Sequence, residues 1–126
     1  MNSYLLDTHI FIWAMEESKR LPKDIKSKIS DPNNKVFISV ATAWEIIIKR
    51  MKNKLKAPKD IPGGIKTAGF RVLPIEITHV LGVEGLPLYH QDPFDRILIA
   101  QAKIEKLTLI TSDKKFKKYN LSLILI

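Results

Sequence analysis

The chain has 126 residues, 45% of them hydrophobic and 27% charged, so it is long enough to bury a core and lacks the composition of a disordered chain. It contains no cysteine, which excludes a disulfide scaffold and a thiolate metal site and suits a reducing cytoplasm. The formal net charge of +8 favours a polyanionic partner, because phosphates that are neutralised by lysine or arginine release their counterions.

The N-terminal segment does not have the pattern of a signal peptide. It lacks a basic region, and Asp7 interrupts its apolar run. No stretch of the chain reaches the roughly 18 uninterrupted apolar residues of a membrane span. We therefore expect a soluble cytoplasmic protein with no membrane partner.

Strand-like and helix-like runs alternate along the whole chain. In the first half of the chain the sequence predicts a strand at residues 3–7, helices at 9–16 and 22–30, a strand at 36–40, a helix at 42–55 and a loop or loosely wound helix start at 57–64. In the second half it predicts a strand at 70–75, a helix at 78–85, a loop at 86–91 and a helix at 92–106. A strand at 108–111, a short helix at 114–119 and a strand at 121–126 complete the chain. Within these helices, Pro22 is expected in a first turn and Thr78 as an N-cap.

Alternation of this kind is typical of βαβ units. We expect one α/β domain over residues 1–126, with a flavodoxin-like three-layer architecture. Its parallel sheet of about five strands should carry helices on both faces, with the first strand in the middle and the fourth beside it.

Four acidic residues fall where a predicted strand ends or a predicted helix begins: Asp7, Glu45, Asp95 and Asp113. The carboxyl ends of parallel strands share one edge of a sheet, and ligands bind in the crevice there. Four carboxylates in that crevice could not all stay ionised without a counter-charge, which Mg²⁺ would supply through oxygen ligands. Less direct candidates for lining such a site are Asp92, Thr8, His9, Ser39, Thr111 and Ser112.

Each of these carboxylates also has a purely structural interpretation. Asp7, Asp92 and Asp113 each fit the N-cap of the following helix, and Thr42 and Glu45 fit a capping box. Asp95, at the third position of its helix, would interact favourably with the helix dipole. Glu45 nevertheless lies in the apolar run WEIII, where a carboxylate must be paired, protonated or bound to a metal.

The basic residues form two clusters, one over Lys49–Lys59 and one at Lys114, Lys115, Lys117 and Lys118. Lysines often only solvate helix faces, but a basic surface around an acidic pocket would attract a phosphate backbone. The candidates for contact with nucleic acid are Lys49, Arg96, Lys114 and Lys115. The chain has no histidine pair with zinc spacing, no glycine-rich phosphate loop and no serine or cysteine nucleophile motif.

Four segments resemble PIN-domain ribonucleases, specifically the VapC-like toxins of type II toxin–antitoxin pairs. They are LLDTHIFIWA (5–14), SVATAWEIIIKRMKNKL (39–55), HQDPFDRILIAQA (90–102) and LITSDKKF (109–116). Asn53 departs from the pattern, since related sequences commonly carry glycine there; it should alter a helix C-terminus and not the chemistry.

The resemblance implies a PIN-like fold in which Asp7, Glu45, Asp95 and Asp113 are the acidic quartet of an endoribonuclease. It also implies Mg²⁺ or Mn²⁺ as the cofactor, RNA as the substrate, a homodimer, and a cognate antitoxin that blocks the site.

Three other functions compete with this interpretation. A phosphatase of the haloacid-dehalogenase type needs a second aspartate two residues after Asp7, where this chain has His9. A receiver-like module needs an aspartate at the end of a middle strand, where Ile75 and Glu76 stand. A basic RNA-binding module, in which the carboxylates are only caps, would differ from the enzyme in leaving RNA uncut.

Overall fold

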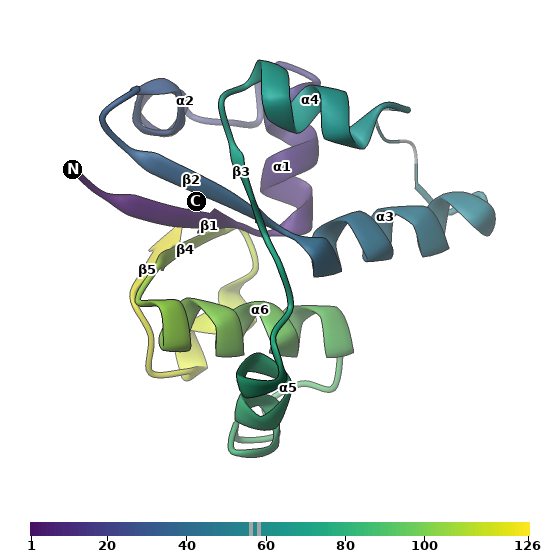
Figure 1. Ribbon diagram of the computed structural model, residues 1–126, viewed down its shortest axis with the longest axis vertical. Helices are drawn as coiled ribbons and strands as arrows, with labels where there is room; N and C mark the ends of the chain where they lie inside the picture. Colours follow the sequence, from purple (N-terminus) through teal and green to yellow (C-terminus); the bar gives the residue numbers. More distant parts are fainter. Residues whose placement is uncertain (56, 58) are drawn as a thin grey trace.

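A five-stranded parallel sheet forms the centre of the molecule (Figure 1). The structure is a computed structural model that describes residues 1–55, 57 and 59–126. The strands are β1 (Ser3–Leu6), β2 (Lys35–Ser39), β3 (Arg71–Leu73), β4 (Thr108–Thr111) and β5 (Leu123–Leu125), in the order β3-β2-β1-β4-β5. The predicted parallel sheet, with the first strand in the middle and beside the fourth, is confirmed.

Helices cover both faces of this sheet, as predicted. One face carries α1 (Thr8–Met15), α2 (Lys23–Ser30) and α4 (Ile61–Thr67), and the other carries α5 (Ile77–Glu84) and α6 (Pro93–Glu105) (Figure 1). The alternation of side chains along β1 explains the two cores: Tyr4 and Leu6 pack under the first group and Leu5 under the second. Helix α3 (Val40–Met51) continues from β2 and contributes to both cores through Ile46 and Ala41.

The register of the two middle strands sets the position of their first polar residues. Leu6 pairs with Ile110, and the Asp7 amide donates to the Ile110 carbonyl at 3.1 Å. Strands β1 and β4 therefore end at the same level, which brings Asp7 next to Thr111 at the carboxyl edge of the sheet.

Helix α3 begins earlier than predicted. Ser39, at the end of β2, is its N-cap and accepts a hydrogen bond from the Ala41 amide at 3.0 Å. Thr42 is fully buried inside the first turn, so the expected capping box between Thr42 and Glu45 is wrong. The physical reason is that strand β2 leads directly into the helix, and Ser39 reaches the free amides first.

The C-terminus of α3 explains the unusual Asn53. Asn53 has a left-handed φ of 54°; its amide donates to the Arg50 carbonyl and the Lys54 amide donates to the Lys49 carbonyl. These are the two bonds of a Schellman motif, whose left-handed residue is usually glycine and sometimes asparagine. The expectation that Asn53 affects the end of this helix is confirmed.

Two other local predictions are wrong, and one that was left open is decided. Residues 57–64 were predicted as a loop or a loosely wound helix start, and helix α4 begins at Ile61, where the Asp60 side chain accepts from the Gly63 amide and caps the helix. Helix α5 begins at Ile77, with Glu76 as its N-cap, so Thr78 is not a cap. Pro22 is itself the N-cap residue of α2. Pro58, in the predicted segment 57–64, and Lys56, in the basic cluster Lys49–Lys59, lie outside the described residues.

Within the described part of the chain, the helices are too short or too polar to cross a membrane.

Candidate active site

A small cavity of about 140 Å³ lies at the carboxyl edge of the sheet. All four predicted acidic residues line it, together with four of the secondary candidates and one lysine. The lining residues are Asp7, Thr8, His9, Glu45, Lys49, Asp92, Asp95, Ser112 and Asp113. Segments that are far apart in sequence are thus brought together as the strand-end argument predicted. Ser39 is used instead as the N-cap of α3.

Asp7 combines a structural and a site position. Its Oδ1 atom accepts from the Ile10 amide at 3.0 Å, which caps α1, and its Oδ2 atom accepts a short hydrogen bond from the Thr111 hydroxyl. Burial raises the pKa of the Asp7 carboxyl group, although the hydrogen bonds from Thr111 and Ile10 act against this shift. The capping interpretation of Asp7 is correct but does not exclude a role in the cavity.

Glu45 is buried and paired on both oxygens. Oε1 accepts from the Thr8 hydroxyl at 2.5 Å, and Oε2 lies 2.5 Å from the Nζ atom of Lys49, one helical turn further along α3. The hydrogen bond to Glu45 is the main reason why the pKa of Lys49 is raised. Lys49, predicted to contact nucleic acid, therefore serves first as the counter-ion of this buried carboxylate.

The pKa of Asp95 is also raised. Burial, followed by the negative charges of Asp92, Glu45, Asp7 and Asp113, raises the pKa of Asp95 to about 7. Asp92 and Asp113 are N-caps: Asp92 Oδ1 accepts from the Phe94 and Asp95 amides, and Asp113 Oδ1 accepts from the Lys115 amide. The charges of several carboxylates thus act on Asp95 at once.

The cavity fits a hard divalent cation better than a zinc ion. Its lining offers carboxylate and hydroxyl oxygens, and the crowding that raises the pKa of Asp95 is the kind that a cation relieves. Among residues 1–55, 57 and 59–126, no three acidic or histidine side chains stand close enough to form a ready-made metal cage. Mg²⁺ does not need one, because it keeps several waters and is usually bound by one or two carboxylates.

Comparison with known proteins identifies the family. The family model described as the PIN domain matches residues 4–121 of this chain. The chain belongs to the PIN-domain family. No curated protein matches it significantly.

Solved structures share the fold of this PIN domain over nearly its full length. VapBC2 from Rickettsia felis, bound to a DNA fragment from their promoter, has a TM-score of 0.68 at 19% identity, with 98% of each chain covered. A toxin–antitoxin complex from Klebsiella pneumoniae has a TM-score of 0.66 at 20% identity, with 96% of this chain and 95% of that chain covered. VapBC-1 from nontypeable Haemophilus influenzae has a TM-score of 0.65 at 23% identity, with 98% of this chain and 97% of that chain covered. At these identities the likeness establishes the fold, which confirms the predicted PIN-like architecture.

Two of the predicted nucleic-acid contacts, Lys114 and Lys115, directly follow a residue that lines the PIN-domain cavity. Lys114 and Lys115 are exposed at the start of the short 3₁₀ helix η1 (Lys114–Lys118), directly after Asp113. Lys117 and Lys118 are exposed on the same helix. Contact of these lysines with nucleic acid remains a prediction.

Arg96 is not placed to contact nucleic acid, which corrects the prediction. It is only 7% exposed, and its guanidinium donates to the carbonyls of Val83, Leu86, Pro87 and His90 at 2.8–3.3 Å. Arg96 therefore holds the segment between α5 and α6 in place. The sequence could not show this, since the four acceptors are backbone groups.

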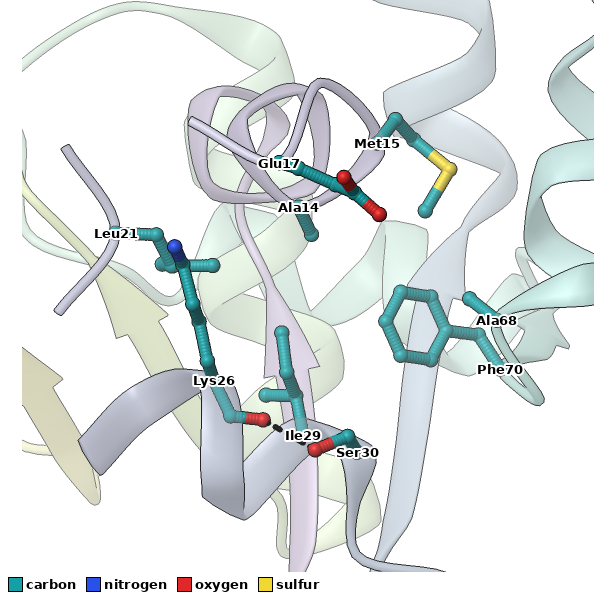
Figure 2. A pocket seen from close by; sticks show the side chains of 9 residues that line it. All are labelled: Ala14, Met15, Glu17, Leu21, Lys26, Ile29, Ser30, Ala68 and Phe70. Atoms are coloured by element: carbon teal, nitrogen blue, oxygen red, sulfur yellow. Dashed lines mark hydrogen bonds between the residues drawn. The ribbon is translucent and has the colours of Figure 1, made fainter. Parts of the chain in front are cut away.

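A larger cavity of about 470 Å³, separate from the one lined by Asp7, Glu45, Asp95 and Asp113, lies between α1, α2 and the end of α4. The side chains of Met15, Leu21 and Phe70 surround it, and Glu17 is the one carboxylate among the described residues that line it (Figure 2). This hollow lacks the clustered oxygen ligands of a hydrolytic metal site.

Proposed function

We propose that this PIN domain, taken as one unit over residues 1–126, is a divalent-metal-dependent endoribonuclease and the toxin of a toxin–antitoxin pair. The observation that carries the proposal is the convergence of Asp7, Glu45, Asp95 and Asp113 on one cavity from four separate segments of the chain. Burial and the neighbouring carboxylates accordingly raise the pKa of Asp95. A protein that keeps so many acidic groups around one cavity, without a catalytic need, would lose stability through their repulsion.

Asp7, Glu45, Asp95 and Asp113 would hold Mg²⁺ or Mn²⁺ in this cavity. When bound, such an ion supplies an activated water and stabilises the negative charge that develops on the phosphate. The hydroxyls of Thr111 and Thr8 fix the orientation of the Asp7 and Glu45 carboxylates. A carboxylate of the same set orients the attacking water and accepts its proton.

The lysines of η1 would hold the RNA backbone beside the cavity. Lys114 and Lys115 follow Asp113 directly and are exposed, so a phosphate that they bind lies near the acidic residues. Lys49, which pairs with Glu45, is a third positive group at the same edge.

The competing interpretation of the carboxylates as mere caps accounts for only part of the set. It describes Asp7, Asp92 and Asp113 correctly. Glu45, however, lies in the second turn of α3 and Asp95 at the third position of α6, so neither is an N-cap residue. The burial of Glu45 and the crowding around the partly buried Asp95 favour the enzyme over the binding module.

The direct test is incubation of the purified protein with labelled RNA and with DNA of the same sequence, in Mg²⁺, in Mn²⁺ and in EDTA. We expect cleavage of the RNA alone, in either metal and not in EDTA. RNA that is bound and left intact under all three conditions would establish the binding module instead.

We also propose a protein antitoxin and a cytoplasmic location. Support comes from the solved structures of the same fold, several of which are toxin–antitoxin complexes. If the product of the reading frame next to this gene is co-expressed with the chain, it should co-purify with it and suppress RNA cleavage. Cleavage that persists in the co-purified complex would contradict this assignment.

The proposed homodimer finds support in two exposed apolar stripes. Val40, Trp44, Ile47 and Met51 recur along one side of α3, and Ile77, Val80 and Leu81 along one side of α5. Trp44 and Val80 both line an apolar cavity of about 420 Å³, so the stripes adjoin. Sedimentation equilibrium should give a dimer that Ile47→Glu together with Leu81→Glu converts to a monomer. A monomeric wild-type protein would contradict the proposal.

A further inference from the structure

Asp95 is linked to two side chains outside the acidic quartet, His90 and, through it, Tyr119. The His90 side chain is only 8% exposed, and its Nε2 atom lies 3.3 Å from Asp95 Oδ2. Its Nδ1 atom lies 2.7 Å from the hydroxyl of Tyr119. His90 thus connects a buried tyrosine to a carboxylate of the cavity.

The Nε2 atom of His90, which faces Asp95, has no hydrogen-bond partner among the residues that the structure describes. In the described part of the chain, His90 Nε2 is one of two buried side-chain polar atoms without a hydrogen-bond partner. An orphaned buried nitrogen is costly, and catalytic hydrogen bonds are often long before the ligand binds. A small approach of Asp95 Oδ2 to Nε2 would satisfy it.

The Tyr119 hydroxyl can donate to Nδ1 or accept from it, and the two cases correspond to different tautomers of the ring. When this hydroxyl donates to Nδ1, a neutral imidazole carries its proton on Nε2, which then faces Asp95 as a donor. The ring cannot easily rotate away, because it packs against Phe116 and Tyr119 with centroid separations of 5.6 and 5.4 Å.

We propose that Tyr119 and His90 position the Asp95 carboxylate: Nε2–H of His90 holds Oδ2, and the other oxygen of Asp95 is left for the cavity. The inference rests on the proposed function, since it assigns an orientation to one of the metal-binding carboxylates. Carboxylates that bind metals are commonly held by such a second hydrogen bond, whose loss weakens metal binding about 10–100-fold.

The same arrangement ties Asp95 to the segment that carries Asp113 and the lysines of η1. Phe116 lies in η1 and Tyr119 is its C-cap residue, while Asp113 is its N-cap. The segment that presents Lys114 and Lys115 is therefore the one that fixes His90. A change in Tyr119 should affect Asp95 although the two residues do not share an element.

The alternative is that His90 only fills space beside Phe116. Three variants separate the two roles. His90→Leu keeps the bulk and removes both nitrogens, His90→Gln restores a donor near the place of Nε2, and Tyr119→Phe removes the hydroxyl alone. Tyr89→Phe is the matched control, because Tyr89 is an exposed tyrosine that stacks on Tyr119.

The experiment measures the affinity for Mn²⁺ alone by calorimetry, without RNA, together with the ¹⁵N shifts of the His90 ring. We expect His90→Leu and Tyr119→Phe to bind Mn²⁺ about 10–100-fold more weakly. His90→Gln should recover most of the loss and Tyr89→Phe should match the wild type. The wild-type ring should be the Nε2–H tautomer.

Equal Mn²⁺ affinity in wild type and Tyr119→Phe, or a wild-type ring protonated on Nδ1, would overturn the positioning role. A loss in His90→Leu that His90→Gln does not recover would assign His90 to packing. A wild-type protein that binds no Mn²⁺ would instead overturn the proposed function itself. If His90→Leu does not fold, Tyr119→Phe and the ring shifts still decide the matter.

Discussion

The Nζ atom of Lys49 lies 2.5 Å from Oε2 of Glu45, so the protein places one of its own cations in an otherwise acidic cavity. In the metal-free protein this ammonium group offsets part of the repulsion among the carboxylates. It also occupies an oxygen that a metal ion would use. Lys49 and a divalent cation should therefore compete.

We predict that Lys49→Met lowers the melting temperature of the metal-free protein and enlarges the rise that millimolar Mg²⁺ produces. A ligand that binds only the native state stabilises it by mass action, and loss of the competing lysine increases that affinity. Differential scanning fluorimetry with and without Mg²⁺ measures both effects. Lys54→Met, on an exposed lysine beyond the end of α3, is the control and should change neither. A smaller Mg²⁺ shift in Lys49→Met would show that the lysine assists the ion.

The pH dependence of stability should reveal the crowded carboxylates. The folded-state pKa of Asp95 is raised from 3.8 to about 7, so the folded protein holds the proton more tightly than the unfolded one. The unfolding free energy of the metal-free protein should therefore fall as the pH rises from 3.8 to about 7. The raised pKa of Asp7 acts in the same direction.

The titration of His90 has the opposite effect on the unfolding free energy below pH 6.5. Burial lowers its pKa, so stability is lost as the pH falls below the unfolded value of 6.5. Urea titrations of wild type and Asp95→Asn at several pH values isolate the Asp95 contribution as the difference between the two curves. A constant difference across this range would contradict the raised pKa.

The lysines of η1 should control RNA binding and not the chemical step. Replacing Lys114, Lys115, Lys117 and Lys118 with glutamine should weaken RNA binding and flatten its salt dependence, whose log–log slope is roughly −0.7 per phosphate contact for single strands. The single-turnover rate at saturating RNA should change little, because the lost contacts are made equally in the ground and transition states.

A matched variant replaces four exposed lysines from elsewhere on the surface: Lys19, Lys23, Lys66 and Lys103. It carries the same change of net charge and should leave most of the salt slope intact. If both variants behave alike, RNA is attracted by net charge and not by the lysines of η1.

Asn53 should matter for stability alone. A residue with a β-carbon costs roughly 1–2 kcal/mol in the left-handed region, and asparagine tolerates this region better than most. Asn53→Ala should lower the unfolding free energy by about 1 kcal/mol, whereas Asn53→Gly should not lower it. Both should cleave RNA at the wild-type rate. Equal stability of the two variants would argue against the left-handed cap.

The part of the site that lies at strand ends could be predicted from sequence. Asp7 and Asp113 follow runs of apolar residues, and the parallel arrangement of those strands places them at one edge. The buried position of Glu45 was also evident from its neighbours in WEIII. Hydrophobic periodicity and strand ends can be read from local sequence, and the parallel sheet brings the residues that they identify close together in space.

The pairings inside the site could not be predicted in the same way. The hydrogen bond from Thr111 to Asp7 spans 104 positions, and that between His90 and Tyr119 spans 29, so neither leaves a local pattern. Arg96 was misassigned because a helix dipeptide of aspartate and arginine looks the same whether the arginine faces phosphate or backbone carbonyls. The sequence left residues 57–64 as either a loop or a helix start, because Gly63 and Gly64 weaken the helix propensity where α4 begins.

The central claim is that Asp7, Glu45, Asp95 and Asp113 perform chemistry together. The decisive measurement is the single-turnover rate of RNA cleavage in saturating Mg²⁺ for Asp7→Asn, Glu45→Gln, Asp95→Asn and Asp113→Asn, taken with the metal-free unfolding midpoint of each. Asparagine retains the Oδ1 acceptor that caps α1 and η1, so the charge is removed and the cap is kept. Every variant should cleave RNA more slowly by orders of magnitude. The unfolding midpoints of Asp7→Asn, Asp95→Asn and Asp113→Asn should be no lower than that of the wild type, because repulsion is relieved, whereas Glu45→Gln also loses the ion pair with Lys49. Near-normal cleavage in folded variants, or an Asp95→Asn variant that unfolds but keeps its specific activity, would contradict the account.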